Sequence, residues 1–417
     1  MRAEIISVGD ELLIGQVINS NAAYIATQLN SVGIAVEKMT TVSDSEPAIL
    51  DAFQKALSAC SVVTVTGGLG PTHDDITRAA VCKFFKRELV TDELALENIK
   101  RRLARRNIAF IKRNQEQAFV PQGCTIIQNN HGTAPGYLFH EDGKYFIVMP
   151  GVPMEMKGMM DEFVVPYFAG KRIGASILHR TLKTTGIAES MLAELIGNVE
   201  DLFPHDSGTT LAFLPSTTGV RLRITVHAPF RIEAEQRAHD VEVKIRSKVE
   251  RYIYGTDTEE LEEVLGTMLN ERRLSISAAE SCTGGLIADR LTNVSGSSNY
   301  FERGIVTYSN ESKIAELGVP RSLVKQHGAV SREVAEAMAF GIRTKSNTDI
   351  GISTTGIAGP TGGTVEKPVG LVWIGHSDRS QTFALRFDFA SDRRSFKERV
   401  AQAALDLVRR KLLNIES

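Results

Sequence analysis

The chain of 417 residues has few cysteines, a single tryptophan and no long apolar run. Its four cysteines are Cys60, Cys82, Cys124 and Cys282, and no two of them have the Cys-x-x-Cys spacing of a zinc or redox site. A chain of this size does not need disulfides to fold, so we expect reduced thiols. No apolar stretch approaches the roughly 20 residues of a membrane-spanning helix, and the run after Met1 is too short for a signal peptide. We therefore expect a cytoplasmic protein with no membrane partner.

Neither sign of charge dominates. Lys and Arg total 48 against 50 Asp and Glu, which leaves a net charge of −2. A dedicated nucleic-acid-binding domain usually carries a basic excess, so direct binding of nucleic acid is not expected. The basic run at Lys100, Arg101 and Arg102 is typical of a solvated helix face.

The length exceeds what one hydrophobic core usually serves, so several domains are expected. Strand and helix patterns alternate through the first third of the chain, which indicates an α/β fold with a parallel sheet. The middle mixes extended runs and helices in a small α+β module. A last α/β domain follows a helix that Asp257 and Thr258 are predicted to cap. The predicted domains are 1–169, 170–255 and 256–417.

The β-branched run Val62–Thr66 shows no alternation, which is typical of a central parallel strand covered on both faces. Directly after it come Gly67, Gly68 and Gly70, then the carboxylates of Asp74 and Asp75. Parallel α/β sheets bind ligands at the carboxyl ends of their strands, so a ligand crevice is expected here. The alternative is that the two aspartates only cap the next helix.

In the last domain, Ser281 lies between a strand predicted over 274–278 and a helix. Amide hydrolysis needs a nucleophile, a base and donors to the developing oxyanion. Ser281 could be the nucleophile, and Thr283, Gly284 and Gly285 offer backbone amides at the start of the helix. Two alternatives remain: Ser281 and Thr283 only cap the helix, or Cys282 is the nucleophile.

Lys313 is the candidate base for this serine. A lysine normally has a pKa of about 10.4, so burial or a second cation, Arg303 or Arg393, must lower it. Tyr308 could relay the proton or orient the substrate. A solvated Lys313 is the alternative. The glycine-rich segment 354–363 could bring its backbone close to a phosphate or carboxamide, or it could be a plain surface loop.

Several motifs together resemble the competence/damage-inducible protein A (CinA) family over nearly the whole chain. In the N-terminal part they are Ser7–Leu13, Thr66–Thr72 with Asp74–Thr77, Gly132–Gly136 and Pro150–Pro153. In the C-terminal part they are Ala279–Gly285, Tyr308–Lys313, His327–Ser331, Gly356–Pro360 and Lys367–Gly370.

The resemblance implies a molybdopterin-binding-like three-layer domain, a KH-like α+β middle module and a C-terminal α/β deamidase domain. The middle module lacks the Gly-x-x-Gly loop that clamps nucleic acid, so we interpret it as a spacer or dimerisation element of a homodimer.

For the C-terminal domain, the resemblance implies deamidation of nicotinamide mononucleotide to nicotinate mononucleotide and ammonia, a step of pyridine-nucleotide salvage that needs no cofactor. It places the nucleophile on Ser281 and assisting roles on Lys313 and Tyr308. The implied substrate-binding residues are Glu280, Thr283, Gly284, Gly285, Thr355, Gly356, Gly359 and Arg393.

For the N-terminal domain, the resemblance implies a pyrophosphatase that acts on ADP-ribose and depends on a divalent metal ion. The implied metal ligands are Asp10, Asp74 and Asp75. The implied phosphate-binding residues are Gly67, Gly68, Gly70, Thr72 and Thr77. Two alternatives remain: this domain binds a pterin or nucleotide without turnover, or the protein is an accessory factor in DNA uptake or repair.

Overall fold

The computed structural model describes residues 1–417 except 71, 73–74, 106, 108, 172–175 and 416–417. The chain divides into two compact units, 1–178 with 226–237 and 179–225 with 238–417. The first unit contains the N-terminal domain, and the second contains most of the middle module with the C-terminal domain. Among the described residues, none of the helices is both long enough and apolar enough to cross a membrane.

The N-terminal domain is built on a six-stranded sheet. Its order is β2 (Ala35–Val42), β1 (Arg2–Val8), β3 (Val62–Thr66), β8 (Lys144–Met149), β7 (Gly136–Glu141) and β6 (Thr125–Ile127). The first four strands are parallel, and β7 and β6 are antiparallel. The predicted central strand is confirmed as β3, whose five residues are all buried.

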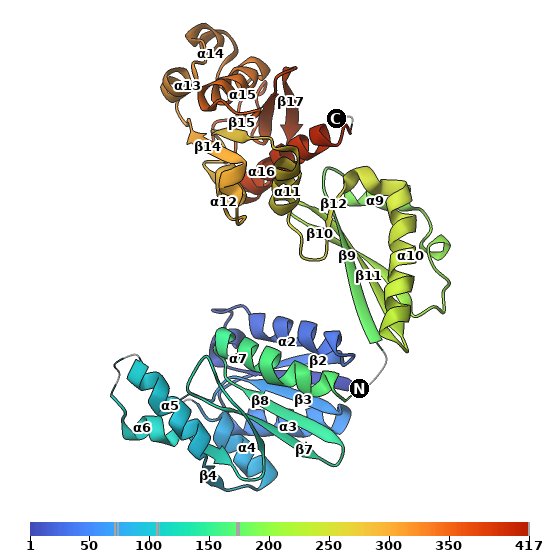
Figure 1. Ribbon diagram of the computed structural model, residues 1–417, viewed down its shortest axis with the longest axis vertical. Coiled ribbons are helices and arrows are strands. Elements are labelled where there is room, and N and C mark those ends of the chain that lie inside the picture. The colour runs from blue at the N-terminus through green and yellow to red at the C-terminus, as the bar shows by residue number, and fades with distance from the viewer. Residues whose placement is uncertain (71, 73–74, 106, 108, 172–175, 416–417) are drawn as a thin grey trace. The chain divides into compact units, whose positions relative to one another are not determined.

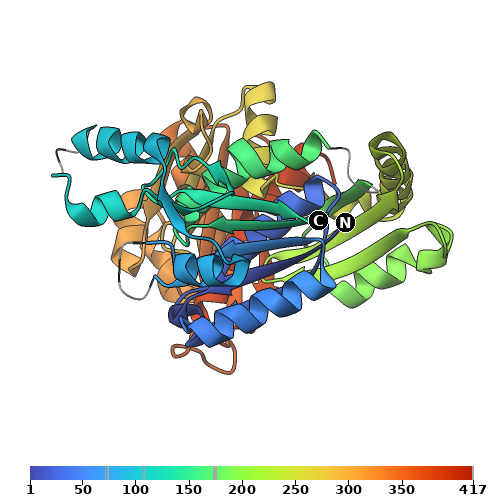
Figure 2. The same ribbon diagram turned by 90° about the horizontal axis from the view of Figure 1, so that it is seen from below.

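Helices cover both faces of this sheet. Figures 1 and 2 show the layers, with α2 (Ser20–Ser31) and α7 (Pro153–Met159) on one face and α3 (Glu46–Ala59) and α4 (Thr77–Phe85) on the other. Ile5 packs in one core and Ile6 in the other, because successive strand side chains point to opposite faces. The remaining elements are α1 (Asp10–Leu13), β4 (Leu89–Thr91), α5 (Glu93–Arg105), α6 (Lys112–Glu116), β5 (Phe119–Pro121), a π-helical turn (Met160–Val164) and α8 (Val165–Ala169).

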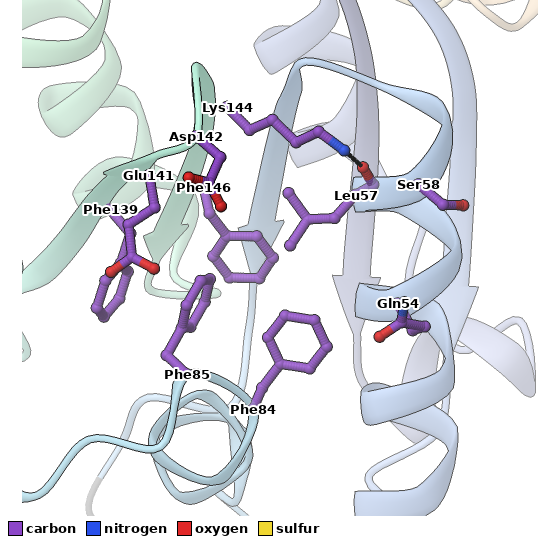
Figure 3. A pocket seen from close by; sticks show the side chains of 10 residues that line it. All are labelled: Gln54, Leu57, Ser58, Phe84, Phe85, Phe139, Glu141, Asp142, Lys144 and Phe146. Carbon is purple, nitrogen blue, oxygen red and sulfur yellow. Dashed lines mark hydrogen bonds between the residues drawn. The ribbon is translucent and has the colours of Figure 1, made fainter.

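Phenylalanine rings from α4, β7 and β8 form a cluster in this domain (Figure 3). Phe85 stacks on Phe139 with ring centroids 4.3 Å apart, and Phe146 packs edge-on against Phe85. The rings line a cavity of about 470 Å³. Lys144, the first residue of β8, also lines this cavity and donates to the Leu57 carbonyl. The cavity therefore lies beside the amino end of β8, whereas ligands are expected at the carboxyl ends of the strands.

The middle module is a four-stranded sheet with helices, in which β12 (Ile253–Thr256) pairs antiparallel with β9 (Ser176–Thr184). The sheet order is β10 (Thr209–Ser216), β11 (Gly219–Ala228), β9 and β12. Its helices are α9 (Glu189–Ile196) and α10 (Arg231–Val249), with short 3₁₀ turns at Val199–Asp201 and Glu250–Tyr252. The turn after α9 reads Gly197-Asn198-Val199-Glu200, so an acidic residue stands where a second glycine would complete a Gly-x-x-Gly loop.

The C-terminal domain has a five-stranded sheet. Its order is β14 (Phe301–Val306), β13 (Ile276–Glu280), β15 (Ile350–Gly356), β16 (Leu371–Ser377) and β17 (Thr382–Asp388), and the first three strands are parallel. One face packs against α11 (Leu261–Arg272), α12 (Leu286–Thr292) and α16 (Arg393–Leu412). The other faces α13 (Asn310–Leu317), α14 (Arg321–His327) and α15 (Arg332–Ser346). A 3₁₀ turn spans Ser297–Asn299.

The helix starts in this domain test the predicted caps. Ser331 caps α15 by accepting from the amide of Val334, and Asp392 caps α16 by accepting from the amides of Arg394 and Ser395. The prediction that Asp257 and Thr258 cap α11 was wrong. Glu260 precedes that helix instead. Asp257 lies in a turn with positive φ, and its carboxylate accepts from the amide of Thr181 at 2.8 Å.

Candidate active site

Three strand ends meet at one edge of the C-terminal sheet. The chain passes from β13 to its neighbour β14 on one side and later returns to β15 on the other. Ligands of open α/β sheets bind where the strand order reverses in this way. Ser281 directly follows β13, Thr307 and Tyr308 follow β14, and β15 ends at Gly356. The structure thus brings the three predicted motifs of this domain to a single edge.

Ser281 and Lys313 are in direct contact. The Lys313 Nζ lies 3.1 Å from the Ser281 Oγ and donates to the carbonyls of Thr307 at 2.8 Å and Tyr308 at 3.4 Å. The lysine side chain is buried, with Lys313 1% exposed. Burial lowers the pKa of Lys313, and the nearby Cys282 opposes this shift only in part. Neither Arg303 nor Arg393 is a cause of the shift, so desolvation alone favours the neutral amine that a base requires.

Glu280 is fully buried beside this contact. Its carboxylate accepts from the amides of Gly285 at 2.9 Å, Ile287 at 3.1 Å and Ala288 at 2.9 Å. These bonds fix the turn and satisfy amides at the start of α12. The geometry therefore gives Glu280 a positioning role in place of the predicted contact with substrate, because its oxygens face the loop.

Backbone amides of this turn were predicted to donate to an oxyanion. The Gly285 amide donates to Glu280, so it is not available as an oxyanion donor as predicted. In the described part of the chain, the amides of Thr283 and Gly284 donate to no protein acceptor. Gly284 and Gly285 have φ of 61° and 96°, the left-handed region that favours glycine. Of the three predicted oxyanion donors, the amides at 283 and 284 are therefore the two that remain available.

Thr354 joins β15 to this turn and was not predicted as a site residue. Its carbonyl accepts from the Ser281 amide at 3.0 Å, and its hydroxyl pairs with that of Thr283 at 2.8 Å. Thr355 donates to the carbonyl of Ala329 at 2.8 Å. The side chains of Thr283 and Thr355 are therefore engaged inside the protein and hold the loops together. The parallel register places Thr354 beside Glu280, which only the paired sheet reveals.

Tyr308 and Arg393 lie together on the exposed side of this sheet edge, and we call this pair of side chains the rim. The tyrosine is 64% exposed, and its hydroxyl accepts from Arg393 Nη2 at 2.8 Å. Arg393 Nη1 donates to the Gly359 carbonyl at 2.9 Å. This contact joins the loops after β14 and β15 to the first residue of α16. Tyr308 reaches Lys313 through its main-chain carbonyl, and its ring lies outside the buried contact.

Cys282 lies next to Ser281 in sequence but points into the core. It is 5% exposed, and burial raises the pKa of its thiol to about 12. The reactive form of a cysteine is the thiolate, so this thiol is poorly suited to attack a carbonyl near neutral pH. The geometry favours Ser281 over Cys282 as the nucleophile.

A second candidate site lies in the N-terminal domain. A cavity of about 340 Å³ is lined by Gly67, Gly68, Gly70 and Asp75, at the carboxyl ends of β1, β3 and β8. A Cβ at position 67 would lie 2.2 Å from the Val8 carbonyl oxygen, so the close approach of these strands requires glycine. Thr77 donates its amide to the Gly68 carbonyl, and its buried hydroxyl has no partner among the described residues.

The predicted acidic set is only partly at this cavity. Asp75 accepts from the Gly70 amide at 2.7 Å, the Thr72 amide at 2.8 Å and the Thr72 hydroxyl, so it organises the loop. Asp10 is not among the lining residues, and its carboxylate accepts from the amide of Asp44 at 3.3 Å. Asp74 lies outside the described residues.

Three other carboxylates line the cavity: Glu11, Asp44 and Glu155. Asp44 follows the end of β2 by two residues, so the strand-end rule that located Gly67 could also have located it. Within the described ranges, no three His, Cys, Asp or Glu side chains are grouped as a metal site. A magnesium-type ion takes only one or two protein carboxylates and completes its shell with water and substrate phosphate, so the acidic wall fits such an ion.

The fold and sites define a multidomain α/β protein with a buried serine–lysine pair in its last domain. Residues 4–170 match the model of a probable molybdopterin binding domain, 179–255 the KH domain of damage-inducible protein CinA, and 258–412 the CinA C-terminal domain. The chain belongs to the CinA family. The predicted resemblance is confirmed, as is the predicted fold class.

Relatives match over the full length. A CinA-like protein of Chloroherpeton thalassium is 48% identical over 423 residues, which cover 99% of this chain and 100% of that protein. A protein of Caldicellulosiruptor saccharolyticus named as competence-damage inducible is 45% identical over 414 residues, with the same coverage. The crystal structure of the competence/damage inducible protein CihA from Agrobacterium tumefaciens is 37% identical, covers 37% of this chain and 97% of that one, and has a TM-score of 0.35.

The burial of Cys282 predicts its resistance to alkylation. In the native protein at pH 8, iodoacetamide should modify Cys282 at least about tenfold more slowly than the half-buried Cys82, because the buried thiol forms little thiolate. Peptide mass spectrometry would follow each site, with the guanidinium-unfolded chain as the control in which all four cysteines react. Equal rates at Cys282 and Cys82 would contradict the described geometry.

Proposed function

We propose that the C-terminal domain is an amidohydrolase that converts nicotinamide mononucleotide to nicotinate mononucleotide and ammonia. The observation that carries the proposal is the buried Lys313 amine 3.1 Å from the Ser281 hydroxyl, beside two amides at the start of α12. This geometry supports hydrolysis of an amide. Membership of the CinA family supports the choice of substrate.

The proposed reaction uses Lys313 as a base and then as an acid in each of its two halves. The neutral amine takes the proton of the Ser281 hydroxyl as the oxygen attacks the carboxamide carbon, and the amides of Thr283 and Gly284 donate to the oxyanion. The Lys313 ammonium then gives its proton to the departing amino group, which releases ammonia and leaves an ester on Ser281. Lys313 then takes a proton from the water that attacks this ester and returns it to the departing Ser281 oxygen, which releases the carboxylate and restores the hydroxyl. Arg393 at the rim offers its guanidinium to the substrate phosphate.

Replacing the nucleophile tests the proposal. Ser281→Ala should lower kcat for ammonia release by about 10³-fold or more, because the covalent route is lost and only binding and the oxyanion donors remain. Ammonia is measured by a coupled assay and nicotinate mononucleotide by mass. Ser298→Ala, an exposed serine of the same domain, is the matched control and should keep full activity. An active Ser281→Ala enzyme together with an inactive Cys282→Ala enzyme would overturn the assignment.

The pH profile tests the base. Lys313 must be neutral to accept a proton, so kcat/KM should rise with pH through the lowered pKa, on a limb centred below the ordinary lysine value of 10.5. Lys313→Arg should lower kcat/KM by about 10²- to 10⁴-fold and remove this limb, since arginine stays protonated. Lys325→Arg on the exposed face of α14 is the control. A limb at the ordinary lysine pKa would show that burial does not tune the base.

We also propose that the N-terminal domain is a divalent-metal-dependent pyrophosphatase acting on ADP-ribose. Support comes from a glycine-lined cavity at the strand ends with an acidic wall of Glu11, Asp44, Asp75 and Glu155. Glu11 and Asp44 would hold the ion, and the bound ion would neutralise charge on the transferring phosphate. Asp75 holds the loop after β3 by accepting from the amides of Gly70 and Thr72, so these two amides are not available to the phosphates as predicted.

Chelation and Asp44→Asn test this second activity. Each should lower AMP release from ADP-ribose by at least about tenfold, the loss expected when a residue supporting a metal site is removed, and neither should change ammonia release. Asp51→Asn, on the exposed face of α3, is the control. Tight binding of ADP-ribose with no product at any metal concentration would show that the domain binds without turnover.

A further inference from the structure

The second unit contains a cavity of about 720 Å³ that the proposed reactions do not use. One wall is the face of α16, and the facing wall is formed by the β9–α9 turn and the β10–β11 turn of the middle module. Ser281, Lys313, Tyr308 and Arg393 do not line it. The volume falls within the range of small-molecule sites, roughly 300–1,000 Å³.

The wall on α16 carries polar side chains at helical spacing. Arg399, Gln402 and Asp406 lie three and four residues apart and therefore share one face, whereas Val400, Ala404 and Val408 pack into the core. Asp406 already has a partner, because its carboxylate accepts from the Arg409 Nε at 2.7 Å. Arg399 and Gln402 remain to be explained.

Both of these side chains hold donors without acceptors. Arg399 makes no hydrogen bond or ion pair with any described residue, and its Nε is buried. Gln402 is 3% exposed; its Oε1 accepts from Arg290, but its Nε2 has no partner within the described chain. Burying a charge or a donor without a partner is unfavourable. An acceptor group with negative charge would satisfy both.

The other walls favour an anion that carries a flat ring. The α9 helix begins after Ala188, whose side chain cannot cap it, so the positive end of the helix dipole borders the cavity. Glu189 in the same turn is exposed and also borders the cavity, so its charge opposes this effect in part. The rings of Phe387 and Phe389 stack with centroids 5.7 Å apart at 17° and offer an apolar surface. Planar rings pack well on such surfaces.

We propose that this cavity is a binding site for a ligand of the nucleoside monophosphate class. The phosphate lies against Arg399 and the first amides of α9, the base packs on Phe387 and Phe389, and Gln402 donates to a ligand oxygen. The site is separate from both proposed catalytic sites and does not rest on either activity.

AMP is the probe that tests this site, in the full-length protein. Calorimetry gives the affinity, and hydrogen exchange should show AMP protecting segments 185–190 and 396–406. Arg399→Met should weaken this binding at least about tenfold, the loss of one charged hydrogen bond. The control Arg394→Met removes the same charge from the same helix at a side chain that is 91% exposed, and should leave the affinity unchanged.

Further measurements distinguish specific AMP binding at this cavity from non-specific attraction of a phosphate to positive charge. Because AMP is also the product expected at the N-terminal cavity, only protection of segments 185–190 and 396–406 supports the proposal. Gln402→Leu should weaken AMP, and adenosine and inorganic phosphate should each bind more weakly than AMP. Arg399→Met should melt no lower than the wild type, since it removes an uncompensated charge. Absent protection in these segments, or equal weakening by Arg399→Met and Arg394→Met, would overturn the proposal.

Discussion

The proposed chemistry of the C-terminal domain depends on one buried contact, between the Lys313 amine and the Ser281 hydroxyl. Water would hold the amine in its charged form, and the fold removes that water. Two main-chain carbonyls, from Thr307 and Tyr308, hold Nζ in place where β14 ends. Burial of a group that prefers charge is unfavourable for stability, yet it is the same burial that makes the amine able to take a proton.

The position of Ser281 in this contact depends in turn on the buried carboxylate of Glu280. Glu280 accepts hydrogen bonds from three amides of the turn and of α12. Hydrogen bonds to an ionised carboxylate are stronger than those between neutral groups. They fix the backbone that carries Ser281, and they leave the amides of Thr283 and Gly284 pointing away from protein acceptors. Positive φ at Gly284 and Gly285 makes this path possible. The proposed base, nucleophile and oxyanion donors therefore come from one short segment and one lysine.

Local pattern and strand-end geometry were sufficient for much of this arrangement. The unbroken β-branched run predicted β3, the strand-end rule predicted a crevice beside Gly67, and the need of a serine nucleophile for a base paired Ser281 with Lys313. The strand before the serine was predicted over 274–278 but spans Ile276–Glu280, so Ser281 follows it at once.

What could not be predicted depends on contacts between distant segments. Glu280 lies in a motif that resembles a substrate-binding segment, and only the folded turn shows that its oxygens face three backbone amides. Asp10 belongs to a motif, but the side chains that line the cavity include its neighbour Glu11 and the distant Asp44. The burial of Lys313 results from packing of α13 on the sheet, which no window of sequence reports.

The final helix, α16, carries side chains of two separate sites, the serine site and the cavity beside the middle module, only six residues apart. Arg393, the first residue of α16, holds the rim through Tyr308 and Gly359, while Arg399 faces the cavity beside the middle module. Six residues of α-helix span about 9 Å, and a helix packed on a core moves as a body. A ligand that shifts α16 against the middle module must therefore also shift the guanidinium at the rim of the serine site.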